Sequence, residues 1–316
     1  MKRFFINIFA ISIIFIAISV IIEVLLLYRP NTYSYKKEYV EQHINDIECL
    51  LLGNSHIEEA LDPHEMGHGV FNMAMSGRPI VYDVELTKMY VPLMNNLKVL
   101  IVPLDYTGFY FGRDTDNPED KKLPDVYEET YKCMYCKYMN IRVDGLWYWS
   151  EILHSKLNYM TRFVKDKKDN IECDSLGFIP LKLSYRHLNW EHIGLPNPID
   201  TLKKIDMQKY ETLYNQYVTI AKAAMEKNVR LVLLSTPLYK TAKKYVSKEI
   251  DYEISSFVNR LQKVYPNIEY YNYRFDKRFD DDDYADSHHL AESGAKKFSN
   301  IVKNEILRGY TNHATE

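Results

Sequence analysis

Two short polar motifs, far apart in the chain, carry residue types that together could do acyl-transfer chemistry. The first is Gly53-Asn54-Ser55-His56, which directly follows an apolar run. Where a buried strand turns into a short helix, a side chain is exposed and free backbone N–H groups point toward it. A serine at that turn can attack a carbonyl carbon while its own N–H helps to hold the oxyanion, provided that a base lies within reach. The bland alternative is that Ser55 merely caps a helix, and the first motif alone favours neither.

The second motif, Asp286-Ser287-His288-His289, offers the base and a group to orient it. An aspartate three residues before a histidine can bond one imidazole nitrogen and so fix the tautomer that leaves the other nitrogen free to accept a proton. Asp286 with His289 fits that description, and His288 is the competing base. The alternative for both histidines is an ordinary exposed loop. A serine, a histidine and an aspartate in these contexts predict a nucleophile at Ser55.

The elements around these motifs predict an α/β domain. Short apolar runs bounded by turn residues are typical of buried parallel strands, and they cover residues 47–52, 70–73, 99–103, 229–235 and 268–271. Apolar residues at three- and four-residue spacing predict helices over 81–93, 210–226, 250–264 and 292–307. Strands that alternate with helices form a parallel sheet whose site lies at the carboxyl ends of the strands. Ser55 follows the first strand and His289 the last, so we expect them to meet there.

The regular pattern is interrupted from about residue 106 to 206, a stretch too long for a simple connection. We interpret it as a largely helical insertion. It contains an amphipathic segment over 152–164, a tryptophan pair and a C-x-x-C pair: Trp147, Trp149, Cys133 and Cys136. The aromatic side chains could stack on sugar rings, but a small core of the insertion's own is favoured because tyrosine is abundant along the whole chain. The two cysteines lack the second pair that a four-thiolate zinc site needs, so we interpret them as structural.

The first thirty residues predict a membrane anchor. From Phe4 to Tyr28 the chain is almost entirely apolar, and about twenty apolar residues suffice to span a bilayer. A signal peptide has a shorter apolar region and a small-residue cleavage site, so we expect an uncleaved anchor over 1–30 and one domain over 31–316. Lys2 and Arg3 indicate a cytoplasmic N-terminus and an extracytoplasmic domain, although basic residues also follow the span. A secreted enzyme would instead require cleavage near Tyr28.

Composition argues against several other functions. The formal net charge is −3, so no excess of positive charge is available for a phosphate backbone, and nucleic acid is not an expected partner. No glycine-rich phosphate loop is present. The acidic run from Asp280 to Asp283 is more typical of a solvated loop than of a calcium site. His64 and His68 lack an evident third ligand, and Pro63 makes a continuous helix there doubtful. We therefore predict no metal and no cofactor.

At motif level, the residues resemble the SGNH or GDSL-type hydrolases. The first block of that family has its serine after a strand in a G-D-S context, and Leu50 to His56 is similar to it with Asn54 in place of the aspartate. The last block, D-x-x-H, resembles Asp286 to His289, and the residues that follow are also similar: Leu290, Gly294, Ala295, Phe298 and Ser299. The resemblance implies a flavodoxin-like three-layer α/β/α sandwich and an ester- or acyl-processing site.

The resemblance also implies an oxyanion hole, of which this chain has only part. The family adds a glycine amide from a second block, which Gly77 could supply, and an asparagine from a third block. After the third predicted strand this chain reads Val102-Pro103-Leu104-Asp105-Tyr106, without that asparagine. Asn72 or a group from the insertion is the expected substitute. Loss of one oxyanion donor typically costs about 100- to 1000-fold in rate.

The series Gly53 to His56, then Asp62-Pro63, then Phe71 to Gly77 resembles most the membrane-anchored members that serve cell-envelope polymers. Examples are the teichoic-acid D-alanyl transfer protein and the alginate O-acetyltransferases. These resemblances imply an esterase or O-acyltransferase acting on acyl groups, acetyl first among them, of a cell-surface polysaccharide. Hydrolysis and transfer stay open. The rival hypothesis is a catalytically weak polysaccharide-binding or assembly subunit beside a membrane-protein partner, and its motivation is the missing asparagine.

Overall fold

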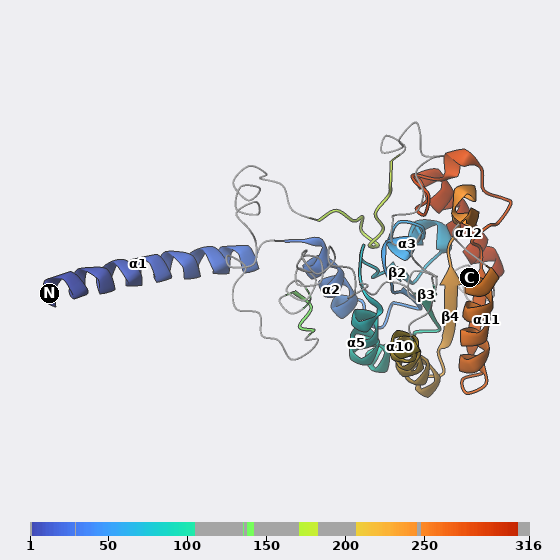
Figure 1. Cartoon of the computed structure of the whole chain (residues 1–316), viewed down its shortest axis with the longest axis horizontal. Helices are drawn as coiled ribbons and strands as arrows, with labels where there is room; N and C mark the ends of the chain where they lie inside the picture. Colours follow the sequence, from blue (N-terminus) through green and yellow to red (C-terminus); the bar gives the residue numbers. More distant parts are fainter. Residues whose placement is uncertain are drawn as a thin grey trace. The chain divides into compact units, whose positions relative to one another are not determined.

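The computed structural model describes residues 2–28, 30–104, 135, 138–141, 171–182, 207–244 and 248–308 (Figure 1). The chain divides into two compact units, Met1–Tyr39 with Pro124–Glu172 and Val40–Leu123 with Cys173–Glu316. The tryptophan pair, the C-x-x-C cysteines and the amphipathic segment at 152–164 lie outside the described residues. The predicted insertion at about 106–206 and the domain boundaries derived from it therefore stay predictions.

The first unit begins with the apolar helix α1 (Lys2–Leu27). Its stretch Arg3–Ile21 is long and apolar enough to cross a membrane, and its described side chains are almost all exposed. Exposed apolar side chains on every face of a helix are unfavourable in water and suited to lipid. After α1 comes α2 (Thr32–Gln42), which Asn31 caps by accepting hydrogen bonds from Tyr33 N and Ser34 N.

The second unit is built on a five-stranded parallel sheet in the order β2-β1-β3-β4-β5. The strands are β1 (Cys49–Leu51), β2 (Val70–Asn72), β3 (Val99–Pro103), β4 (Arg230–Ser235) and β5 (Ile268–Asn272). Every residue of β1, β2 and β3 is buried, which explains why these strands read as continuous apolar runs. All five predicted strands are confirmed, and the order is that of a flavodoxin-like sheet.

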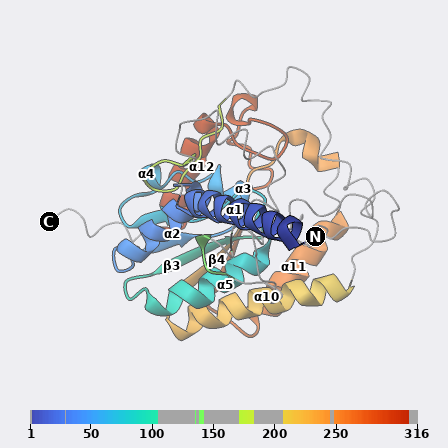
Figure 2. The ribbon, with the colours of Figure 1, turned by 90° about the vertical axis from the view of Figure 1, so that its left-hand side faces the viewer.

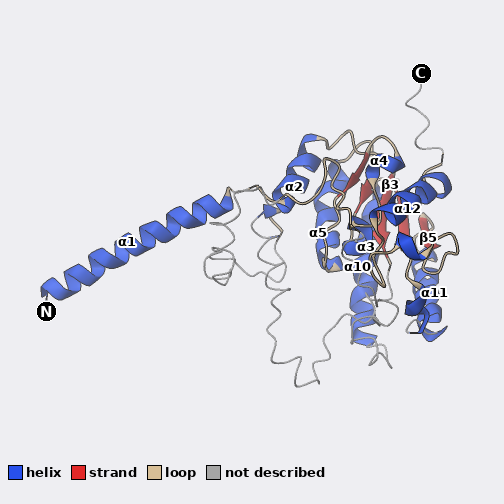
Figure 3. Cartoon of the chain, turned by 90° about the horizontal axis from the view of Figure 1, so that it is seen from above, coloured by secondary structure: helices blue, strands red, loops and turns tan. Residues whose placement is uncertain are grey.

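Helices cover both faces of this sheet. They are α3 (Ser55–Glu58), α4 (Pro63–Met66), α5 (Ile80–Tyr90), α10 (Met207–Glu226), α11 (Lys248–Gln262) and α12 (Glu292–Glu305), with the short 3₁₀ segments η1 (Val91–Leu93), η5 (Lys240–Lys244) and η6 (Asp281–Asp283). On one face α5 packs on α10 and α10 on α11, while α4 packs on α12 on the other (Figures 2 and 3). The predicted α/β/α layering is confirmed.

Local chemistry explains where two helices stop. The helix predicted over 81–93 becomes 3₁₀ after Tyr90, because Pro92 has no N–H to continue the α-helical pattern. Similarly, α4 starts at Pro63 and stops before Gly67, whose φ is 122°. As expected from those two residues, His64 and His68 do not share a continuous helix.

Two loops at the carboxyl edge of the sheet carry the residues singled out above. One follows β1 and leads into α3. The other lies between β5 and α12, where an antiparallel bridge between Tyr284 and Leu290 closes the turn that holds Asp286 and His289. Because β1 and β5 are parallel strands of one sheet, their following loops emerge on the same side.

Candidate active site

The turn after β1 presents Ser55 as the first residue of α3. The N-cap of α3 is Asn54, whose Oδ1 accepts a hydrogen bond from His56 N at 3.1 Å. Capping is thus done by Asn54, and the Ser55 hydroxyl is left for another partner. The alternative in which Ser55 only caps the helix is wrong, because Asn54 is the residue that caps it.

Gly53 makes the direct passage from strand to helix possible. Its φ is +128°, a conformation that side chains rarely adopt. A Cβ at this position would lie 2.4 Å from Pro103 Cδ. The close approach of the turn to the end of β3 therefore requires glycine, and it fixes where the following serine points.

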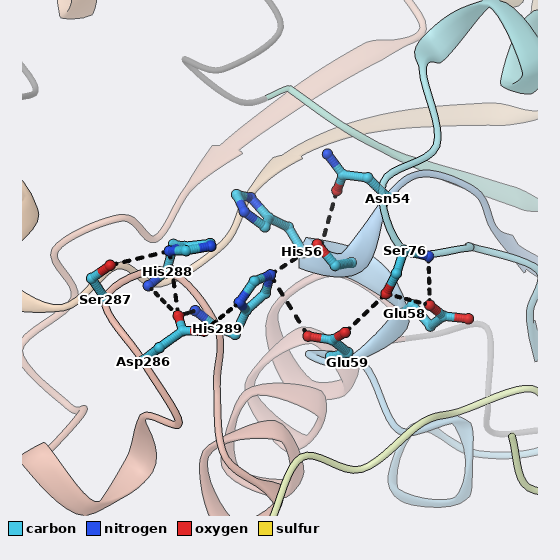
Figure 4. A network of polar contacts seen from close by, with 10 residues as sticks. Asn54, His56, Glu58, Glu59, Ser76, Asp286, Ser287, His288 and His289 are labelled. Atoms are coloured by element: carbon cyan, nitrogen blue, oxygen red, sulfur yellow. Dashed lines mark hydrogen bonds and ion pairs between the residues drawn. The ribbon is translucent and has the colours of Figure 1, made fainter. Parts of the chain in front are cut away.

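Three predicted site residues, Ser55, His289 and Asp286, meet in one hydrogen-bonded chain, of which Figure 4 labels the histidine and the aspartate. Ser55 Oγ lies 2.8 Å from His289 Nε2, and His289 Nδ1 lies 2.8 Å from Asp286 Oδ2. The other carboxylate oxygen, Oδ1, accepts hydrogen bonds from the backbone N–H groups of His289 and His288 at 2.8 and 2.9 Å. A carboxylate held by two backbone donors accepts from Nδ1–H, so Nε2 is the nitrogen that can take the serine proton.

His288 has a different environment from His289. Its Nδ1 lies 3.1 Å from Ser287 Oγ and 3.3 Å from Asp286 Oδ1. Burial, followed by the charge of His289, lowers the pKa of His288 to about 3. Its ring is therefore neutral at physiological pH, and of the two histidines it is His289 that faces the serine hydroxyl.

Asp286 is ionised at neutral pH. Burial by itself raises the pKa of this carboxyl, but the hydrogen bond from His289 and the charges of His289 and His288 outweigh it. The net effect holds the pKa well below its usual value. A fixed negative charge is what an imidazole needs to become positively charged during proton transfer.

A buried ion pair ties the loops after β1 and β2 together. Arg78 Nη2 lies 2.5 Å from Asp83 Oδ1, and both side chains are almost completely buried. The same Asp83 oxygen accepts a hydrogen bond from Gly53 N at 3.0 Å, while Arg78 Nη1 donates to Met73 O at 2.8 Å. The pair thus fixes one end of the serine turn and one end of the neighbouring loop.

The two predicted oxyanion donors have different fates. Asn72 is fully buried, and its Nδ2 donates to Ile57 O, Glu58 O and Leu61 O at 3.2, 3.2 and 2.9 Å. An amide that already serves three carbonyls has no hydrogen to spare for an oxyanion, so these contacts favour a structural role for Asn72 over the predicted one. Gly77 is an exposed residue of the loop after β2, with φ 69°.

The loop that carries Gly77 runs beside the serine turn, because Met75 N donates to Gly53 O at 3.0 Å. The use of the Gly77 backbone amide as an oxyanion donor stays a prediction. The residues after Leu104, where the third family block would lie, fall outside the described part of the chain.

Sequence reasoning missed two carboxyls and a serine beside this site. Glu58 and Glu59 lie at the end of α3, and both contact Ser76 from the loop after β2 (Figure 4). Glu59 Oε2 lies 3.7 Å from His289 Nε2. Their spacing from Ser55 could have indicated this, because residues three and four positions after the serine lie on the same side of a helix as the serine.

Two groups of histidines and carboxyls in the described ranges have ligand-type atoms within 4.8 Å of one another. One is His56, His288 and His289, in which His289 Nε2 already contacts Ser55 Oγ. The other is Asp62, His64 and Asp174, in which Asp62 Oδ1 caps α4 and half-exposed His64 lies 3.4 Å from Asp174. Hydrogen bonds and ion pairs already use His288 and His289 of the first set and all three residues of the second, and the absence of a metal stays a prediction.

The acidic run 280–283 also has a structural use. Asp280 and Asp283 form a capping box around η6, and Lys297 forms an ion pair with Asp283, which is buried. The run thus closes the turn before the histidine loop. Gly294 fits against it, since a Cβ there would lie 2.0 Å from Asp283 O.

Comparison with known proteins leaves the family open. A scan against protein-family models finds no match, and a search of curated proteins finds none. Among solved structures, the chain is similar to a candidate platelet activating factor from Streptococcus pneumonia, with 11% identity, TM-score 0.43, and coverage of 92% of this chain and 97% of that one. It is also similar to TesA, with 9% identity, TM-score 0.36, and coverage of 80% and 95%. Similarities this weak say nothing about function, so the function has to be inferred from the residues of this chain.

Proposed function

We propose that the protein is a serine esterase or O-acyltransferase of the SGNH type. The observation that carries the proposal is the chain of 2.8 Å contacts from Ser55 Oγ through His289 to the Asp286 carboxylate. Its members come from loops 234 residues apart in sequence and are brought together only by the parallel sheet. A helix cap or an ordinary polar loop does not require a serine, a histidine and an aspartate to be hydrogen-bonded in this order.

The chemistry follows from the roles that the contacts allow. Ser55 Oγ attacks the acyl carbon while His289 Nε2 takes its proton, and Asp286 stabilises the imidazolium that forms. His289 then gives the proton to the leaving oxygen. In the second half, water or a hydroxyl gives its proton to Nε2 and attacks the acyl-serine. His289 then returns that proton to the departing Ser55 Oγ, which releases the acid or a new ester. The N–H groups of Ser55 and Gly77 would hold the oxyanion.

The substrate class is inferred from the rest of the chain. The apolar helix α1 would hold the domain at a membrane, outside the cytoplasm if Lys2 and Arg3 mark the inner side. An enzyme anchored there meets cell-surface polymers, and the motif resemblance to envelope-modifying proteins points the same way. We therefore propose acyl groups, acetyl first, on a cell-surface polysaccharide as the substrate.

The test is acyl release by the full chain in detergent micelles. We expect wild-type protein to release acetate from small aryl acetates and from an O-acetylated polysaccharide, and Ser55→Ala to release none above background. Added sugar acceptors that become acetylated would identify transfer, and acetate alone would identify hydrolysis. A folded wild-type protein that releases no acetate from either substrate would contradict the proposal and favour the binding or assembly role.

A further inference from the structure

A pair of carboxyls, Glu58 and Glu59, lies on the opposite side of His289 from Asp286 (Figure 4). Glu58 and Glu59 are 1% and 8% exposed, and they are held by the same short helix that begins with Ser55. Glu59 Oε2 lies 3.7 Å from His289 Nε2, the nitrogen that faces the serine. Asp286 already holds the other ring nitrogen. An acidic group beside Nε2 is not needed to orient the ring, so its position calls for another explanation.

Counting hydrogens favours one proton shared by the pair. Ser76 Oγ lies 2.8 Å from Glu58 Oε2 and 2.9 Å from Glu59 Oε1, but a hydroxyl has one hydrogen to donate. Ser76 N also donates to Glu58 Oε2, at 2.6 Å, so Ser76 holds Glu58 through two contacts and its hydroxyl hydrogen is best placed toward Glu58. The contact between Ser76 Oγ and Glu59 is then a hydrogen bond only if Glu59 is protonated and donates.

The electrostatics of Glu59 agree with that count. Burial raises the pKa of Glu59, and the charge of Glu58 raises it further, against the lowering influence of His289 and Ser76. Two carboxyls that share one site commonly hold a single proton between them. One proton in the pair would allow Glu59–OH to donate to Ser76 Oγ while Ser76 Oγ–H donates to the Glu58 carboxylate.

The remaining Glu59 oxygen, Oε2, is buried and has no hydrogen-bond partner among the described residues. A buried acceptor without a partner is unfavourable. The polar atom that faces it is His289 Nε2, which carries a hydrogen only after it has taken the proton of Ser55. An interaction that exists only in that state favours the transition state over the ground state.

We propose that Glu59, Ser76 and Glu58 form a proton-sharing relay that places negative charge beside His289 when that ring becomes protonated. The proposal rests on the acyl-transfer function proposed above and adds positioning residues to it. As Ser55 gives its proton to Nε2, Glu59 gives its own to Ser76 Oγ, and Ser76 gives its hydrogen to Glu58. Glu59 becomes the carboxylate and Glu58 the acid. When His289 passes its proton to the leaving oxygen, the relay runs back.

The decisive variants are Glu59→Gln and Ser76→Ala in the full chain. Glutamine keeps the size of Glu59 and a partner for Ser76 but cannot ionise, while alanine cuts the relay and leaves Glu59 protonated. Each should lower kcat on an aryl acetate by about ten-fold or more with KM within about two-fold, the effect of one lost charge contact in the transition state. The kcat of the double variant should be no lower than that of Glu59→Gln, because both changes disable the same relay.

A matched control and two further measurements separate the relay from a structural effect. Ser287→Ala removes another hydroxyl beside the site histidines, outside the relay, and should keep kcat within about two-fold. In mixtures of H₂O and D₂O, a plot of the wild-type rate against the D₂O fraction should be curved, because several protons move in one step. The same plot for Ser76→Ala should be a straight line. Infrared spectra should show a protonated carboxyl in the wild type that Glu59→Gln lacks.

The outcomes distinguish the two proposals. The relay is overturned if the wild type is active and Glu59→Gln has the same kcat. It is also overturned if Glu59→Gln is slower while Ser76→Ala keeps the wild-type kcat. Either result leaves the acyl-transfer function standing. Wild-type protein that folds but turns over no ester overturns both. The infrared measurement does not depend on turnover, so absence of the carboxyl band in the wild type also overturns the relay.

Discussion

The buried pair Arg78–Asp83 provides the sharpest stability prediction. Asp83→Asn keeps an oxygen that can accept from Gly53 N but leaves the Arg78 guanidinium, which is fully buried, without a counter-charge. Removal of one partner from a buried ion pair typically costs about 3–5 kcal/mol. Burial raises the pKa of Asp83 to about 6, against the lowering effect of Arg78, so the experiment belongs at a pH well above that value, where the carboxyl is ionised.

The assay is urea unfolding of the purified chain, followed by circular dichroism. We expect Asp83→Asn to lose about 3–5 kcal/mol of unfolding free energy, which is a large share of the ~5–15 kcal/mol typical of a domain. The double variant Arg78→Met/Asp83→Asn should recover most of that loss, because neither charge is then left buried. A loss below about 1 kcal/mol, or a double variant no more stable than the single one, would refute the reasoning.

Three further predictions concern the site. His289→Ala should lower esterase activity by about 10⁴-fold or more, whereas His288→Ala should cost much less, and equal losses in initial rates would contradict the assignment of the base. Asp286 has a folded pKa below its unfolded value, so its contribution to stability is present above about pH 4 and is lost as the pH falls further. Asp286→Asn should therefore flatten the acid side of the stability curve, and an unchanged curve would argue against the depressed pKa. Gly53→Ala should cost more than about 1 kcal/mol in urea unfolding and slow the reaction of Ser55, because its Cβ would collide with Pro103.

Much of this arrangement could be predicted from residues alone. The central strands β1 and β3 were recognisable because they are buried and therefore read as unbroken apolar runs. The order of strands and helices then placed Ser55 and His289 at one edge of the sheet. The spacing of Asp286 and His289 was informative for a local reason, since three residues are enough for one turn to bring carboxylate and ring together.

Other features depended on long-range packing that no local pattern reveals. Asn72 was a reasonable oxyanion donor by position, yet its amide is used to hold three carbonyls of the segment after β1. The pairing of Arg78 with Asp83 joins a loop to a helix and could not be read from either. The proximity of Glu59 to His289 was visible only as a spacing from Ser55, because its burial depends on the loop that carries Ser76.

The central claim is that Ser55 is a nucleophile activated by His289. The most direct measurement is the site and rate of reaction with a fluorophosphonate probe, determined by mass spectrometry on the full chain. The account predicts a single adduct on Ser55 in the wild type, none in Ser55→Ala, and labelling by His289→Ala that is slower by orders of magnitude. A folded wild-type protein that stays unlabelled at Ser55, or that labels equally fast without His289, would contradict it.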